Sequence, residues 1–464
     1  MAQIRLLLPL LLVFVAGCAI QPPPQPAASQ MCAFLSYDLA VEQPPNFGDV
    51  TTERRTLGDV LNEALFRTPQ ADAAPPSESM LFLSGGSLHG AFGAGFLDQW
   101  KRLSTPQHLP DFKVVTGIST GAILSTFAFV DMPERAVEGY TIESESDLLK
   151  PFGAVKKGEP ATSSYIALLR KGALADLAPL RDRLHGFIDD AMLRKVAGEG
   201  TRGRKLLIGV VDVDTGQAVV LDLTDMARQY VAAADAVRAG TARADATDPE
   251  RKRDCYVEGI LASSSAPLAA LPVFIDNRMY VDGGARFGVF SDEIGDEIER
   301  NGDSSAKPTI YVLINGDQEI AGRCGKADPA HCRHGDPAGN VLGAHAGWTF
   351  PQLAVRSERI LTNQVYRFSS SAIAVRAKER GMVVREIKID ADMMEHRFPR
   401  APAGSSAAGS RSCAEWRTFD RDSAANPLQF FPNYMRCLID YGRFQAARKL
   451  PQWQEEDRPD PFGG

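Results

Sequence analysis

VVTGISTGAIL, residues 114–124, is an apolar run, a serine flanked by glycines, and a second apolar run. This order predicts a strand, a sharp turn and a helix, with Ser119 on the turn at the end of a sheet. Such a turn strains the backbone at the serine, and side chains at Gly117 and Gly121 would collide where strand and helix converge. Ser119 is therefore the candidate nucleophile, whereas a later serine run is interpreted as small packing residues: Ser263, Ser264 and Ser265.

A glycine-rich turn precedes this motif in LFLSGGSLHGAFGAG, residues 81–95. An apolar strand over residues 80–83 leads into the turn, and the turn opens a helix that ends near Trp100. Backbone N–H groups at the start of a helix attract negative charge, so the turn is a candidate oxyanion site. No nucleotide site is expected, because Gly93 and Gly95 fall within the predicted helix and no Walker lysine follows.

A candidate base follows in MYVDGG, residues 279–284. These residues close a predicted hairpin whose other arm is 273–275 and whose turn is Asp276-Asn277. A carboxylate on a rigid strand end can accept the proton of a serine that it touches directly. Asp282 is thus the candidate partner of Ser119.

These three segments, in this order, resemble the patatin-like phospholipases over roughly residues 78 to 290. The resemblance implies a three-layer α/β/α fold with a mixed, mostly parallel central sheet. It implies hydrolysis of phospholipid or lysophospholipid esters by a Ser-Asp dyad, without histidine, metal or other cofactor. Carried over residue by residue, it makes Ser119 the nucleophile and Asp282 the base. The remaining site residues that it implies are the oxyanion loop, Gly85, Gly86, Ser87 and Gly90, and the Asp-Gly-Gly glycines, Gly283 and Gly284.

Two positions of the loop depart from the family's usual Gly-Gly-Gly-x-Arg/Lys-Gly. Ser87 stands at the third glycine but keeps its backbone N–H, and His89 stands at the basic position, with charge only near or below pH ~6.5. Two alternatives therefore stay open. One is a patatin-like envelope lipoprotein that binds lipid and turns over poorly. The other is an α/β-hydrolase with a Ser-Asp-His triad, whose histidine would come from His185, His331, His334, His345 or His396.

The N-terminus predicts a bacterial lipoprotein signal. Arg5 precedes an apolar stretch, residues 6–15, that is too short to span a bilayer. Val15-Ala16-Gly17-Cys18 resembles a lipobox, which implies cleavage before Cys18 and attachment of acyl chains such as palmitate. Ala19 carries no aspartate retention signal, so we expect the outer membrane; an ordinary secretory peptide cut near Ala16 is the alternative.

The chain divides into five predicted parts: signal peptide 1–17, lipidated cysteine and Pro-rich tether 18–50, lead-in 51–77, catalytic domain 78–320, and residues 321–464 with a Cys-containing loop, a long helix and a C-terminal extension packed on the core. Residues 131–204 are expected to be mixed and helical and to form the rim or lid of an acyl site. With 44% hydrophobic residues, the chain can bury a substantial core. A formal net charge of −7 argues against a nucleic-acid partner.

Six cysteines remain after Cys18, and an even number in an oxidising compartment favours disulfides. Short loops favour two pairs, which leaves a third pair between the N-terminal segment and the catalytic domain. A zinc site formed by Cys324, His331, Cys332 and His334 is the alternative, but its spacing fits no finger pattern. The three expected pairs are Cys324 with Cys332, Cys413 with Cys437, and Cys32 with Cys255.

Overall fold

The structure is a computed structural model, and it describes residues 31–38, 77–103, 108–156, 159–241, 248–290, 309–316, 350–379, 381–399, 410–425 and 427–450. The predicted signal peptide, Cys18 and the tether to residue 30 lie outside the described residues. So do the Cys324–Cys332 pair, its zinc alternative and His345. None of the described helices combines the length and the hydropathy needed to cross a bilayer.

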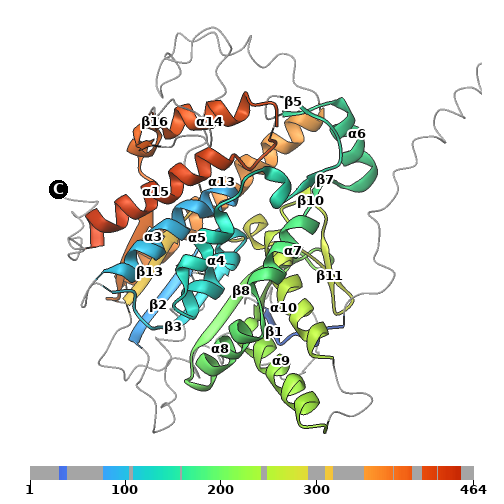
Figure 1. Cartoon of the computed structure of the whole chain (residues 1–464), viewed down its shortest axis with the longest axis vertical. Helices are drawn as coiled ribbons and strands as arrows, with labels where there is room; N and C mark the ends of the chain where they lie inside the picture. Colours follow the sequence, from blue (N-terminus) through green and yellow to red (C-terminus); the bar gives the residue numbers. More distant parts are fainter. Residues whose placement is uncertain are drawn as a thin grey trace, which may run out of the picture.

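A mixed, mostly parallel sheet forms the middle layer of the fold (Figure 1). In spatial order the strands are β1 (Ser36–Asp38), β9 (Ala218–Asp222), β8 (Lys205–Asp212), β3 (Phe112–Ile118), β2 (Ser77–Leu83), β13 (Thr309–Ile314) and β14 (Val383–Lys388). Five neighbouring strands, β8, β3, β2, β13 and β14, run parallel to one another. Beyond β8, the sheet continues with β9, which is antiparallel to β8, and β1, which is antiparallel to β9. The hairpin predicted around Asp276-Asn277 is confirmed, because β11 (Val273–Ile275) pairs antiparallel with β12 (Arg278–Asp282).

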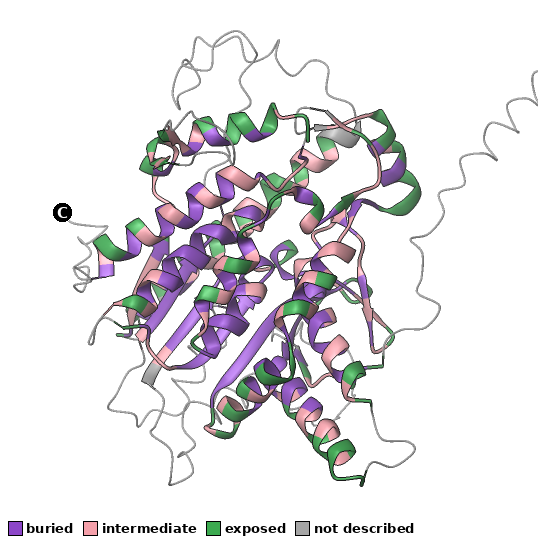
Figure 2. Cartoon of the chain, in the orientation of Figure 1, coloured by how far each residue is buried: buried purple, intermediate pink, exposed green. Residues whose placement is uncertain are grey.

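Helices cover both faces of the sheet, which gives the three-layer α/β/α fold that the resemblance implies. All seven residues of β3 are buried, as expected for a parallel strand with helices on both sides (Figure 2). Successive side chains of β2 point to opposite faces: Leu81 and Leu83 join one core, and Met80 and Phe82 join the other. Several helices contribute residues to the first core, among them α3 (Gly90–Arg102), α4 (Thr120–Phe129), α9 (Leu223–Arg238) and α10 (Pro249–Ser264). On the second face, α13 (Phe350–Glu379) contributes Ile373 and Ala377.

The C-terminal helix α15 (Pro432–Lys449) packs directly on α3 (Figure 1). A Cβ atom at Gly95 would overlap the carbonyl oxygen of Ile439, and one at Gly442 would overlap that of Phe92. Small residues on both helices therefore allow the two backbones to touch. Residues 432–449 are part of the core of the molecule, although they lie far from the catalytic motifs in the sequence.

The remaining elements surround this core. Residues 131–204 are mixed and helical, as the sequence predicts. Their helices are α5 (Pro133–Tyr140), η2 (Glu145–Asp147), α6 (Thr162–Lys171), α7 (Ala178–Phe187) and α8 (Asp190–Thr201), and their short strands are β4 (Lys150–Pro151), β5 (Val155–Lys156), β6 (Glu159–Pro160) and β7 (Ala173–Asp176). Elsewhere lie η1 (Ser87–His89), β10 (Leu268–Ala270), η3 (Gly283–Ala285), η5 (Ala391–Glu395), β15 (Arg397–Pro399), β16 (Ser410–Ser412) and α14 (Cys413–Arg421).

Two of the three expected disulfides are present in the described part of the chain. Cys32 pairs with Cys255 of α10, and Cys413 of α14 pairs with Cys437 of α15. The first joins the N-terminal segment to the catalytic part, and the second fixes two C-terminal helices to each other.

Candidate active site

Ser119 occupies the turn between β3 and α4. Its backbone dihedrals are φ 55° and ψ −124°, a conformation that non-glycine residues rarely adopt and that marks local strain. A Cβ atom on Gly117 would overlap the carbonyl oxygen of Gly121, and a Cβ atom on Gly121 would overlap that of Leu83. Glycine at 117 therefore lets β3 and α4 converge, as expected from the sequence, whereas glycine at 121 lets α4 approach the end of the neighbouring strand β2.

The serine run at the end of α10 supports this strained turn. The N–H of Ser119 donates to Oγ of Ser263 at 2.9 Å, and that hydroxyl donates in turn to the carbonyl oxygen of Gly209 at 2.7 Å. Oγ of Ser264 lies 3.4 Å from the carbonyl oxygen of Ser119, and the carbonyl oxygen of Ser265 accepts the N–H of Asp282 at 3.0 Å. The interpretation of these serines as packing residues alone is incomplete, because they hold both Ser119 and Asp282 in place.

Sheet register brings Asp282 to Ser119. Ile118, the last residue of β3, pairs with Gly209 of β8, and Asp282, the last residue of β12, pairs with the next residue, Val210. The two strands run in opposite directions along β8, so their last residues meet end to end beside it. The side chain of Ser119 lies near enough to the Asp282 carboxyl group to lower its pKa, and the N–H of Gly284 donates to Oδ1 of Asp282 at 2.7 Å.

The environment of Asp282 favours its protonated form. Burial raises the pKa of the Asp282 carboxyl to about 7, against the hydrogen bonds from Ser119 and Gly284, which lower it. The charge of Glu358 on α13 raises this pKa further. A carboxyl group poised near neutral pH can accept a proton and return it within one reaction cycle.

The glycine-rich turn lies beside the serine. A Cβ atom on Gly85 would lie 3.0 Å from that of Ser119, so the turn and the elbow are in van der Waals contact. Gly86 has φ 152°, and a Cβ there would lie 2.6 Å from the carbonyl carbon of Asn315, so only glycine fits. Asn315, which follows β13, also holds the glycine-rich turn in place. Its N–H donates to Oγ of Ser84 at 2.8 Å, and its side-chain amide donates to the Ser84 carbonyl oxygen at 2.9 Å.

Beyond the turn, the chain continues through η1 into α3, so the backbone N–H groups of the turn lie at the N-terminal end of a helix. Gly90, the first residue of α3, packs so closely that a Cβ would overlap the hydroxyls of Thr120 and Tyr140. His89 faces α15 instead of the serine, because its ring meets the ring of Tyr434 edge to face, with the Tyr434 hydroxyl 3.5 Å from Nε2.

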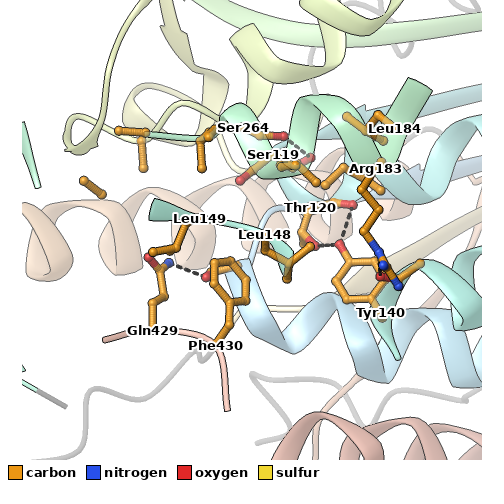
Figure 3. Close-up of a pocket in the computed structure, with 18 of the residues that line it drawn as sticks. Ser119, Thr120, Tyr140, Leu148, Leu149, Arg183, Leu184, Ser264, Gln429 and Phe430 are labelled. Atoms are coloured by element: carbon orange, nitrogen blue, oxygen red, sulfur yellow. Dashed lines mark hydrogen bonds between the residues drawn. The ribbon is translucent and has the colours of Figure 1, made fainter. Parts of the chain in front are cut away.

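An apolar pocket opens at Ser119 (Figure 3). It encloses about 870 Å³ of unfilled space, mouth included, and its walls are mainly aliphatic and aromatic. Residues from α5 and α7 form much of its lining, so the segment 131–204 does contribute to the rim, as the sequence predicts. Examples are Ala136, Tyr140, Leu180, Leu184 and Phe187.

Two parts of the site come from segments that the motifs do not reveal. Tyr366 of α13 is buried against the site, and a Cβ on Gly284 would lie 2.6 Å from its hydroxyl. On the other side, Gln429 and Phe430 line the pocket beside Leu148 and Leu149 (Figure 3). Both segments lie far from the three motifs in the sequence, so no local pattern points to them.

The two described histidines of the triad alternative do not line the pocket at Ser119. His185 lies on α7 with Nε2 3.5 Å from a carboxylate oxygen of Asp254, and His396 pairs with Asp440 at 2.8 Å. His331, His334 and His345 lie outside the described residues. Within the described ranges, no group of three or more His, Cys, Asp or Glu side chains could hold a metal ion.

The chain has a layered α/β/α fold. Its strained serine lies beside a buried carboxyl group and lines an apolar pocket, and this is the architecture of a hydrolase. Residues 81–291 match the family model of the patatin-like phospholipases, so this part of the chain is a patatin-like phospholipase domain. Members of this family hydrolyse acyl esters of lipids. A search of curated proteins finds no match to the chain.

Proposed function

We propose that this protein is a membrane-anchored acyl hydrolase of phospholipids or lysophospholipids, with Ser119 as nucleophile and Asp282 as base. The observation that supports it most is the placement of a strained Ser119 beside a buried Asp282 carboxyl group, at an apolar pocket that Ser119 lines. A carboxylate in direct contact with the hydroxyl can take its proton without an intervening imidazole.

In the proposed reaction, Oγ of Ser119 attacks the ester carbonyl carbon while Asp282 takes its proton. The negative charge that develops on the carbonyl oxygen is bound by backbone N–H groups of the loop at Gly85, Gly86 and Ser87, reinforced by the N-terminal end of α3. As the tetrahedral intermediate collapses, Asp282 gives the proton to the leaving alcohol oxygen. Water then attacks the acyl-enzyme, Asp282 takes its proton and returns it to Ser119, and the fatty acid leaves.

The pocket supports a lipid substrate. Its lining is mainly apolar, so it would bury an acyl chain and gain roughly 0.8 kcal/mol for each CH₂ group removed from water. The ester carbonyl would then lie at the pocket mouth, where Ser119 is 8% exposed. The polar head group would extend outward to solvent or to the bilayer surface.

Hydrolysis of a chromogenic medium-chain ester by the purified protein tests the reaction, with Ser119→Ala as the control. We expect turnover by the wild type, none above background by the variant, and unchanged thermal unfolding, because the hydroxyl lies on a turn and not within the core. Labelling by a fluorophosphonate, located by peptide mass spectrometry, should modify Ser119. A wild-type protein that binds lipid and hydrolyses no ester would favour the lipid-binding alternative.

The membrane anchor is a separate part of the proposal and is supported by Val15-Ala16-Gly17-Cys18. Mass spectrometry of the mature protein should find an acylated N-terminal Cys18, and Cys18→Ser should leave the precursor unprocessed. A mature N-terminus at another residue would contradict the lipoprotein prediction and leave the hydrolase proposal intact.

A further inference from the structure

A short segment just before α15, residues 427–430, forms one side of the pocket. It lies more than a hundred residues beyond the family match, which ends at residue 291. Two of its side chains, Gln429 and Phe430, line the pocket together with Ser119 (Figure 3). The active site is therefore bounded on this side by the C-terminal part of the chain.

One carboxylate holds this segment. Oε2 of Glu145 accepts the N–H of Leu428 at 2.7 Å, and Oε1 accepts the N–H groups of Gln429 and Phe430 at 2.6 and 2.8 Å. Glu145 is 9% exposed and begins η2, whose chain continues into the pocket residues Leu148 and Leu149. Three charge-assisted bonds to consecutive backbone groups fix the path of the main chain whatever the side chains are.

The segment also reaches the oxyanion loop. Nε2 of Gln429 donates to Oγ of Ser87, at the position where this chain departs from the family's third glycine. Ser87 has φ 53°, in the left-handed region that disfavours a residue with a side chain. A serine in this conformation is strained, but its hydroxyl gains a partner that glycine could not bind. The bond thus gives a physical reason for serine at this position.

We propose that Gln429 is a positioning residue that fixes the oxyanion loop through Ser87, that Phe430 sets the acyl-chain preference of the pocket, and that Glu145 holds both. This inference rests on the proposed function, since it concerns how the same site works. Donors to a developing oxyanion stabilise it most when they are already fixed in position. A loop anchored through Ser87 should therefore affect kcat, whereas a pocket wall should affect the use of long chains.

A double-mutant cycle with p-nitrophenyl butyrate tests the role of Gln429. Gln429→Met keeps the size of the side chain and removes the donor, and Ser87→Ala removes the acceptor but keeps the backbone N–H. We expect each single variant to lower kcat about threefold to tenfold, as for the loss of one hydrogen bond, with KM changed less. The double variant should be no slower than the slower single variant, because both remove the same bond. Losses that multiply, or no loss in either single variant, would overturn the role of Gln429.

Chain-length preference tests Phe430. The ratio of kcat/KM for a twelve-carbon ester to that for butyrate should change at least about fivefold in Phe430→Ala, because several buried CH₂ contacts change. Leu428→Ala is the matched control from the same segment, since Leu428 is held through its backbone N–H and its side chain does not line the pocket. Its ratio should stay within about twofold. An unchanged ratio in Phe430→Ala would exclude Phe430 as a specificity residue.

Glu145→Gln tests the shared anchor. The glutamine side chain can no longer accept hydrogen bonds at both of its terminal atoms, so this variant should lower kcat and also change the chain-length ratio. The control is Glu143→Gln, because Glu143 is an exposed neighbour that pairs with Arg436, and it should change neither quantity. If Glu145→Gln fails to fold, the Gln429 cycle and the Phe430 comparison still decide the inference. A wild type with no Ser119-dependent activity would reject the proposed function. An active wild type with multiplicative losses and an unchanged chain-length ratio would reject only this inference.

Discussion

The pKa of the buried Asp282 predicts the pH dependence of catalysis. Burial raises this pKa from 3.8 to about 7. Only the carboxylate can accept the Ser119 proton, so kcat/KM should fall about tenfold for each pH unit below about 7 and level off above it. An aspartate with an ordinary pKa near 4 would leave kcat/KM flat between about pH 5 and pH 8.

The same burial should make the wild type less stable as pH rises. The folded protein keeps the Asp282 proton up to about pH 7, whereas the unfolded chain loses it near pH 4, so the stability contributed by the protonated form is complete below about pH 4 and lost by about pH 7. The full effect is about 4 kcal/mol in the free energy of unfolding. Asparagine does not titrate, so Asp282→Asn should abolish turnover and gain stability over the wild type. That gain should grow by about 3 kcal/mol between pH 5 and pH 8.

Initial rates and urea unfolding across this pH range would measure both effects. Glu358→Gln is the matched control, because it removes a charge that raises the Asp282 pKa without removing the base itself. Its kcat/KM profile should move to lower pH and reach the same plateau. A wild-type profile that stays flat down to pH 5, together with a stability difference that does not vary with pH, would refute the argument from burial.

Three other substitutions test the geometry. Gly86→Val should lower kcat/KM at least about a hundredfold, because its side chain would collide with the Asn315 backbone and displace an oxyanion donor; turnover near that of the wild type would contradict the loop assignment. Ser263→Ala leaves the Ser119 N–H without its partner and should reduce the free energy of unfolding by about 1–3 kcal/mol, measured by urea unfolding. The same variant should also have a lower turnover rate. Replacing Cys32 and Cys255 together by serine should lower the free energy of unfolding by about 2–5 kcal/mol and leave kcat nearly unchanged below the unfolding transition; equal stability would show that the bond constrains little.

The parts of the fold that the sequence predicts are those specified by neighbouring residues. The β3 strand, its glycine-flanked turn and α4 occupy one continuous stretch, so apolar runs and two glycines suffice to define them. The hairpin that carries Asp282 is equally local, since its turn residues and both arms lie within ten positions, 273–282. The resemblance of these motifs, in this order, to the patatin-like phospholipases then implies that serine and aspartate belong to one site.

What the sequence could not predict depends on contacts between distant residues. Glu145 binds a segment that lies 283 to 285 residues further along the chain, and one glutamate in the acidic, serine-containing run 143–147 carries no signal of it. Tyr366 is one aromatic residue in a long helix, and its position over the site follows only from how α13 crosses the sheet. Ser87 was recognisable as a departure from the family loop, but its partner Gln429 was not.

The N-terminal attachment of the domain has a mechanical consequence. Asp276 accepts the N–H groups of Cys32, Ala33 and Phe34, Lys252 donates to the Cys32 carbonyl oxygen at 2.6 Å, and the disulfide joins Cys32 to α10. Tension applied upstream of residue 31 would therefore enter the domain at a covalent bond to a central helix. This force passes through the disulfide to Cys255 and is not carried by β1 or by the chain between residues 33 and 254. A pull on the N-terminal segment would therefore not remove strands from the edge of the sheet one at a time. While the bond is oxidised, the active site should withstand such a force; after reduction, the short β1–β9 ladder and a few hydrogen bonds would have to carry it.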